Sequence, residues 1–417
     1  MQPPISTRLK KTSVVSDNFK NCEPDISTYP LLRAFQSVYF HPLSKTPGPK
    51  LWAYSRLPFI IGFIRGLIRG IVVQDIQRLH LRYGPMVRIA PDEVTFAQPE
   101  AWTDILRADF PKDPRWWAGE PGRESVLAPT FTTHALKGQE PILQQYVNLL
   151  IERLRNLANQ ESAINIAAWC NYTTFDIFGD LGYGEKAACF GSAARFYPLI
   201  ELVLTKCIPT SLREEYDNHR KLIADKVQRR LNLEQERLPL DTINATFLEL
   251  TTGGSETTAT VLSGTLNYLV NNRDKLSILE QEIRDLEESG LSLSTLQDLP
   301  YLNAVLKEGL RLCPPVPWIL SRRVPDGGAH VCGTWLPAGI AVSIQAYSMS
   351  RNSNYFHDAS SFVPKRWLPK VLKVPSSPFS KDRREAVQPF SVGPYSCIGQ
   401  HLAWAEMRLI LAKLGRS

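Results

Sequence analysis

The chain has 417 residues, and its 43% of hydrophobic and 10% of aromatic residues supply enough apolar surface for a large core. Charged residues make up 21%, which excludes a disordered protein or an acidic tail. The net charge of +7 is spread along the chain, so nucleic-acid binding is not indicated. Contact with an anionic membrane or an acidic partner is compatible with this charge, and so is an ordinary soluble enzyme.

The seven cysteines are odd in number, widely spaced and free of any C-x-x-C pair. This pattern argues against a disulfide framework and against a structural zinc site, and it predicts a reducing compartment. In such a compartment the sequons at Asn171 and Asn244 would carry no glycan.

The first 28 residues are polar and contain no apolar segment, which predicts neither a signal peptide nor an N-terminal membrane anchor. We expect a flexible extension over residues 1–29 and a globular domain over residues 30–417. The stretch Leu57–Val73 is strongly apolar but is interrupted by two arginines and three glycines, and it is too short to span a bilayer. Two interpretations fit it equally: a basic helix lying in a membrane interface, or a buried helix whose arginines reach solvent.

Hydrophobic periodicity predicts the elements that follow. An alternating run, Met86-Val87-Arg88-Ile89, predicts a strand. Apolar residues at three- and four-residue spacing predict the helices Glu140–Leu157, Asp241–Val270 and Arg273–Ser289. After Pro314 the sequence is interrupted by prolines and glycines, which predicts the short strands Ala329–Thr334 and Ile340–Ile344. A final periodic segment predicts the helix Ile398–Leu414. The fold class is therefore mainly α with a small β-sheet.

The longest predicted helix contains Gly253-Gly254-Ser255-Glu256-Thr257-Thr258 at its middle. An acid beside an alcohol in an apolar helix can relay protons, and we expect the two glycines to weaken the helix enough to open a groove. The alternative is a polar patch in which the threonine hydroxyls bond back to the preceding turn.

A carboxylate and a guanidinium three residues apart, Glu308 and Arg311, share one face of a predicted helix. Such pairs are common on protein surfaces and contribute little there. Arg366, in the segment FVPKRW, is a candidate third partner that would complete a buried network, because a buried charge needs partners.

Residues 390–399, FSVGPYSCIG, place one cysteine in a bent loop before a helix. Gly393 and Gly399 would let the backbone approach a flat cofactor. Cys397 would lie at a helix N-terminus, where we expect the macrodipole to lower the pKa of its thiol, as an iron ligand requires. The alternative is a buried cysteine that acts as a small hydrophobe.

The order of these blocks, GGSETT, EGLR, FVPKRW and FSVGPYSCIG, resembles the signature of the cytochrome P450 family. The flanking segments YFHPLSKTPGPKLWA, YGPMVRIAPDEVTF and WCNYTTFDIFGDLGYGE are similar to fungal members that act in secondary metabolism. The resemblance covers about residues 30–417 and implies a P450-like haem domain.

The resemblance assigns roles to individual residues. It implies that Cys397 is the axial thiolate ligand of a haem b iron, with Phe390 packed near the sulfur. Glu256 and Thr257 would deliver protons to dioxygen. Arg322, in SRRVP, would pair with a haem propionate. Behind the haem, a structural network would consist of Glu308, Arg311 and Arg366.

The resemblance also implies an activity and its partners. The enzyme would be a monooxygenase that inserts one oxygen atom of O₂ into an apolar small molecule, and terpenoid, polyketide and xenobiotic substrates all fit. Electrons would come from NADPH through NADPH–cytochrome P450 reductase. The implied location is the cytosolic face of the endoplasmic reticulum membrane.

Several positions depart from the family pattern. Tyr395 stands where related sequences carry an arginine, which removes one charge-assisted contact to a propionate. Lys365 replaces a glutamate, and His134 has no arginine four residues later. Segments are shortened at about 126–139 and 230–241, and the chain ends 20 positions after Cys397. The domain is therefore expected to be incomplete. Two alternatives follow: a P450-like chain that cannot retain haem, and a helical membrane-surface binding protein that uses Leu57–Val73.

Overall fold

The computed structural model describes residues 35–115, 132–160, 163–183, 240–286 and 290–417. The predicted extension over residues 1–29 lies outside this part of the chain, as do residues 126–131 and 230–239 of the two segments predicted to be shortened. Helices account for most of the described elements: α2 (Lys50–Tyr54), α3 (Leu57–Ile68), α4 (Val72–Tyr83), α6 (Thr133–Ala158), α7 (Ile166–Tyr183), α10 (Leu240–Val270), α11 (Arg273–Arg284), α12 (Leu293–Gln297), α13 (Pro300–Leu312), α14 (Ala346–Ser350), α15 (Pro369–Leu372) and α16 (Gln400–Arg416).

The remaining elements are short strands and tighter or wider helical turns. The strands are β1 (Met86–Ala90), β2 (Glu93–Phe96), β3 (Ile319–Arg323), β4 (Ala329–Val331), β5 (Thr334–Leu336) and β6 (Ala341–Ile344). The turns are the π-helix η1 (Trp102–Arg107) and the 3₁₀ helices η4 (Pro364–Trp367), η5 (Arg384–Ala386) and η6 (Gly393–Tyr395). The predicted class, mainly α with a small sheet, is confirmed.

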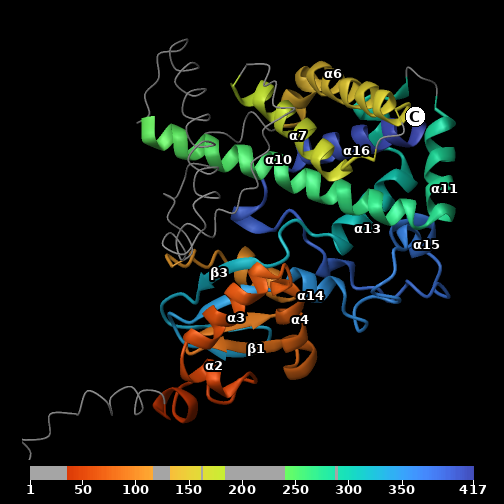
Figure 1. Cartoon of the computed structure of the whole chain (residues 1–417). Coiled ribbons are helices and arrows are strands. Elements are labelled where there is room, and N and C mark those ends of the chain that lie inside the picture. The colour runs from red at the N-terminus through yellow and green to blue at the C-terminus, as the bar shows by residue number, and fades with distance from the viewer. Residues whose placement is uncertain (1–34, 116–131, 161–162, 184–239, 287–289) are drawn as a thin grey trace, which may run out of the picture.

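The fold has a helical part and a smaller sheet part (Figure 1). In the helical part, α10 runs across the molecule and packs against α7, α13 and α16. A large apolar cluster fills the space between these helices. In the sheet part, strands lie in the order β1-β2-β6-β3, with α2, α3 and α4 beside them. A second apolar cluster packs between this sheet and η1.

Strands β1–β2 and β3–β6 pair antiparallel, whereas β2 and β6 pair parallel. The predicted strand at residues 86–89 is confirmed as β1, and the one at 340–344 as β6. The single strand expected over Ala329–Thr334 is wrong, because β4 and β5 form a hairpin. Its turn is Cys332-Gly333, with φ of 48° and 77°, and these left-handed residues reverse the chain.

The long helix α10 is continuous through Gly253 and Gly254, so the expected interruption at these glycines is not observed. A Cβ on Gly254 would lie 2.7 Å from the ring of Phe178 in α7. Further along α10, a Cβ on Gly264 would lie 2.4 Å from Cys313 Sγ, and one on Gly309 of α13 would lie 2.0 Å from a hydroxyl of α10. The glycines therefore serve close helix packing rather than a break.

Other helix ends differ from the expected ones. Helix α6 begins at Thr133, seven residues before the expected start, because Thr132 caps it by accepting a hydrogen bond from the Ala135 amide (3.3 Å). Pro141 lies inside this helix. Helix α11 ends at Arg284, short of the expected Ser289.

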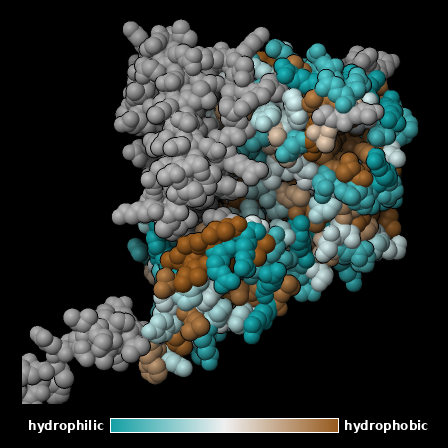
Figure 2. Space-filling view, in the orientation of Figure 1, coloured by the Kyte–Doolittle hydropathy of each residue, from teal (hydrophilic) through white to brown (hydrophobic). Residues whose placement is uncertain are grey.

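The apolar stretch Leu57–Val73 forms two helices rather than one, since Gly70 has φ of +66° and separates α3 from α4. Within α3, Phe59 is buried, whereas Leu57 and Ile68 are 60% and 80% exposed. Figure 2 shows the resulting hydrophobic surface over α3. In the described part of the chain, no helix combines the length and the hydropathy needed to cross a membrane.

Candidate active site

A cavity of about 400 Å³ lies where α10, α13, α16, β3 and the loop before α16 meet. Most of its lining is apolar, including Val261, Leu310, Ile319, Leu402 and Met407. Five of the predicted site residues line it, namely Thr257, Arg322, Phe390, Cys397 and Gly399. The other predicted residues lie behind its wall or beside it.

The Cys397 thiol is exposed to this cavity. Its backbone N–H donates to the carbonyl of Phe390 (2.8 Å), which closes the loop and turns the cysteine inward. Burial raises the pKa of this thiol, and a hydrogen bond from the Gly399 backbone opposes the rise only in part. The expected lowering by a helix N-terminus is therefore wrong, because α16 begins three residues later, at Gln400.

The two glycines of the loop have different surroundings. Gly399 lines the cavity, as a residue that admits a flat group should. Gly393 is not among the residues that line it. With φ of +76° it packs on η1, where a Cβ would lie 2.6 Å from the Leu106 carbonyl oxygen. This glycine therefore docks the loop onto η1.

The α10 wall presents Gly253, Gly254, Thr257 and Thr258 to the cavity. The Thr257 hydroxyl donates to the Gly253 carbonyl (2.6 Å), the back-bonded geometry that the sequence left as an alternative. Glu256 is half-buried and lies outside the cavity lining. Of the predicted acid–alcohol pair, the alcohol alone faces the cavity.

A second acid, which the sequence did not single out, does face the cavity. Glu406 of α16 is 1% exposed and lines the same space. Burial raises its pKa to about 8, and a hydrogen bond with Thr258 of α10 lowers it in part. At neutral pH the Glu406 carboxyl therefore carries a proton.

Glu308, Arg311 and Arg366 are brought together and fully buried. Arg311 donates to both Glu308 oxygens (2.9 and 2.7 Å), and Arg366 Nε donates to one of them (3.2 Å). Trp367 Nε1 donates to the same carboxylate (2.8 Å), and Asp382 takes a second bond from Arg366. Burial alone would raise the pKa of Glu308, but Arg311 and Arg366 hold it below its usual value.

Two cations and an aromatic ring form the rim of the cavity. The Arg322 guanidinium carbon lies 4.0 Å from the centroid of the Tyr395 ring, and Lys112 Nζ lies 5.0 Å from it. Both side chains line the cavity. The phenol also hydrogen-bonds with Arg322 and with Asp109; burial and Asp109 raise the pKa of Tyr395.

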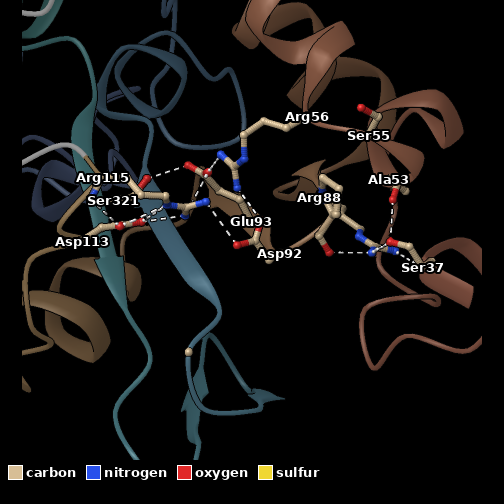
Figure 3. Close-up of polar contacts among 12 residues, drawn as sticks. Ser37, Ala53, Ser55, Arg56, Arg88, Asp92, Glu93, Asp113, Arg115 and Ser321 are labelled. Atoms are coloured by element: carbon tan, nitrogen blue, oxygen red, sulfur yellow. Dashed lines mark hydrogen bonds and ion pairs between the residues drawn. The ribbon is translucent and has the colours of Figure 1, made fainter. Parts of the chain in front are cut away.

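A half-exposed ion network supports this rim from the outside (Figure 3). Asp113 is buried and pairs with Arg115 (2.7 Å) and with Arg323 (3.3 Å). Arg115 continues to Asp92 (3.1 Å). Arg56 closes the network by donating to Asp92 and to Glu93. The network joins the segment after η1 to β2 and β3.

The chain matches the family model for cytochrome P450 over residues 201–415. It is 34% identical to the cytochrome P450 monooxygenase efuB of Hormonema carpetanum, an alignment that covers 93% of this chain and 87% of that protein. It is 36% identical to the monooxygenase cpaH of Aspergillus oryzae, over 93% and 85%. An averantin hydroxylase of Dothistroma septosporum is 35% identical, over 92% and 82%.

The chain belongs to the cytochrome P450 family. It is accordingly a haem-thiolate monooxygenase of the type found in fungal secondary metabolism, which confirms the family, fold and activity that the sequence motifs predicted.

The cavity of this P450 meets the chemical needs of haem. Haem requires a soft ligand for iron, apolar surface for the porphyrin faces and cations for the two propionates. Cys397 supplies the sulfur, the lining supplies the apolar surface, and Lys112 and Arg322 supply the cations. The residues present therefore fit this cofactor.

Sequence reasoning missed three participants in this P450: Lys112, Asp382 and Glu406. Lys112 precedes Asp113 and Pro114 in a short irregular segment, and Asp382 follows a lysine in a loop, so neither carries a periodic signal. Glu406 lies on a predicted helix nine residues after Cys397. An acid on the buried face of that helix was the one available signal.

Proposed function

We propose that this P450 binds haem b through Cys397 and oxidises an apolar small molecule with electrons from NADPH, supplied by NADPH–cytochrome P450 reductase. The observation that carries the proposal is the Cys397 thiol exposed to a largely apolar cavity whose α10 wall bears a hydroxyl. When bound, haem would supply the activation of O₂ and thiolate ligation would favour cleavage of its O–O bond.

The chain's own residues would bind haem, exclude water from the substrate and provide protons. Burial raises the pKa of Cys397, so its thiol is protonated in the absence of a metal. Ligation of iron would therefore release this proton. The apolar lining, including Val261, Ile319 and Leu402, would exclude water from the substrate.

The Thr257 hydroxyl would accept or donate a hydrogen bond at the α10 wall of the cavity. In the described geometry its proton is directed at Gly253, so its oxygen can accept a hydrogen bond from a group in the cavity. Rotation about the C–O bond would redirect that proton into the cavity. Glu256, the residue before Thr257 in α10, would supply a new proton to this hydroxyl, in the role that the resemblance assigns to it.

For the substrate, the lining favours an apolar molecule with few polar groups. Relatives named averantin hydroxylase act on averantin, as their name states. For this P450 the corresponding proposal is an apolar fungal secondary metabolite.

The apolar face of α3 supports attachment to the cytosolic face of the endoplasmic reticulum membrane. Leu57, Ile61 and Ile68 are exposed, and exposed Arg65 and Arg69 add positive charge beside them. This combination suits an interfacial helix on anionic lipid. Flotation with phosphatidylserine-containing vesicles should be lost on Ile61→Ser/Ile68→Ser, while binding that is unchanged would contradict the attachment.

Reduced-plus-CO spectroscopy of the purified protein tests haem-thiolate ligation. The wild type should give the red-shifted Soret band of a thiolate-ligated complex, and Cys397→Ser should lose it. Cys332→Ser, at a cysteine outside the cavity lining, is the matched control and should keep the band. A wild-type protein that retains no haem would favour the alternative of an inert P450-like chain.

A further inference from the structure

Lys112 and Arg322 form an antiparallel bridge between the segment after η1 and strand β3. The amides of Asp113 and Arg323 donate to carbonyls of the opposite strand on either side of the pair (3.1 and 2.8 Å). A pair flanked in this way is of the non-hydrogen-bonded type, whose side chains lie close together on one face. The two cations are therefore neighbours, and both line the cavity of Cys397.

Tyr395 brings both cations to the same wall. Its ring attracts the Arg322 guanidinium at 4.0 Å and the Lys112 ammonium at 5.0 Å from its centroid. The phenol oxygen accepts a hydrogen bond from Arg322 and donates to Asp109. Because Tyr395 is two residues before Cys397, the cations are held at the edge of the space next to the sulfur.

The outer ion network fixes the backbone that carries these cations. Asp113, adjacent to Lys112, is fully buried and pairs with Arg115 (Figure 3). It also pairs with Arg323. Arg323 in turn is adjacent to Arg322. Each cavity cation is therefore next in sequence to a residue that the network holds in place.

Like charges that face each other across a ladder destabilise it, so this arrangement favours an anion between them. We propose that Lys112 and Arg322 together hold the propionate edge of haem, with Tyr395 as their positioning residue. Lys112 thus adds a second cation beside Arg322 at this edge of the cavity. This inference rests on the proposed haem function.

The test measures haem loss rather than turnover. Full-length wild type, Lys112→Met, Lys112→Arg and the control Lys370→Met are each reconstituted with hemin or with hemin dimethyl ester, which lacks the propionate charges. Lys370 is an exposed residue of α15 outside the cavity lining. The rate of transfer to an excess of apo-globin is followed by absorbance.

Lys112→Met should lose hemin about 3- to 10-fold faster than the wild type, the range expected for one partly exposed charge-assisted contact. The two proteins should lose the diester at equal rates. Lys112→Arg and Lys370→Met should match the wild type with either porphyrin.

Equal hemin loss by Lys112→Met and the wild type would overturn the role of Lys112. So would an equal acceleration with hemin and with the diester, because that pattern reports a loosened fold rather than lost charge. In both cases a preserved thiolate-type Soret band leaves the proposed haem function standing. If the wild type forms no such band, the haem function and this inference fail together.

Discussion

The surroundings of Glu308 and Glu406 show that burial alone does not decide the charge of an acid. Both glutamates lie on helices and are at most 1% exposed. Glu308 accepts hydrogen bonds from two arginines and a tryptophan, and its pKa is lowered. For Glu406 burial dominates, with one hydrogen bond from Thr258, and its pKa is raised to about 8. One carboxyl is a fixed anion of the scaffold, and the other holds a proton in the cavity wall.

The largest effect is expected from Glu308→Gln. The substitution leaves Arg311 and Arg366 buried without their shared anion, and removal of one partner from such a network costs about 3–5 kcal/mol. Urea unfolding followed by circular dichroism measures this loss. Glu280→Gln, which breaks the more exposed pair with Arg284 in α11, is the control and should change stability by less than about 0.5 kcal/mol. Equal effects of the two substitutions would show that the buried network around Glu308 stabilises the fold no more than the exposed pair does.

Glu406→Gln should raise the free energy of unfolding relative to the wild type, and the size of this gain should depend on pH. The folded pKa of Glu406 lies above its unfolded value of 4.5. The unfolded state therefore loses its proton first, and the stability of the wild type falls as pH rises from about 5 to about 8. The slope for this group is at most about 1.4 kcal/mol per pH unit.

Glutamine at position 406 does not titrate, so the variant should gain on the wild type steadily over that pH range. Unfolding curves at pH 5, 6, 7 and 8 measure the difference. A constant difference across these values would mean that Glu406 does not hold a proton in the folded protein.

Asp92 is more exposed than either glutamate, and its substitution should give the smallest effect. Burial raises its pKa in part, but Arg56 and Arg115 lower it overall, and its side chain is 40% exposed. Its stabilisation is present above the unfolded pKa and is lost as pH falls through the lowered one. Asp92→Asn should cost about 1 kcal/mol or less, and the loss should shrink in high salt. A loss as large as that of Glu308→Gln would show that solvent does not screen this network.

Local patterns predicted much of the fold and the centre of the site. The i,i+3 pair Glu308–Arg311, the loop around Cys397 and the periodicity of α10 are each carried by neighbouring residues, so the sequence alone revealed them. The pairing of Arg366 with Glu308 was also anticipated, because a buried acid with one cation still accepts another.

The rest depended on contacts between distant segments. Lys112 faces Arg322 only because the irregular segment after η1 pairs with strand β3, and Asp382 reaches Arg366 from a loop. The glycines of α10 were interpreted by their backbone freedom, whereas the fold uses the absence of their side chains. The pKa of Cys397 was misjudged because α16 begins only at Gln400 and because desolvation, a property of the packed loop, outweighs the hydrogen bond from the Gly399 backbone.

The contact of α10 with α13 through Gly264 and Gly309 leaves no room for a methyl group on either glycine. Helices in such contact resist sliding, because any displacement drives backbone into side-chain atoms. Since α10 carries the Thr257 wall and α13 carries Glu308, the cavity wall and the buried network form one stiff frame. Adjustment to substrates of different shape is therefore left to other segments of the cavity lining.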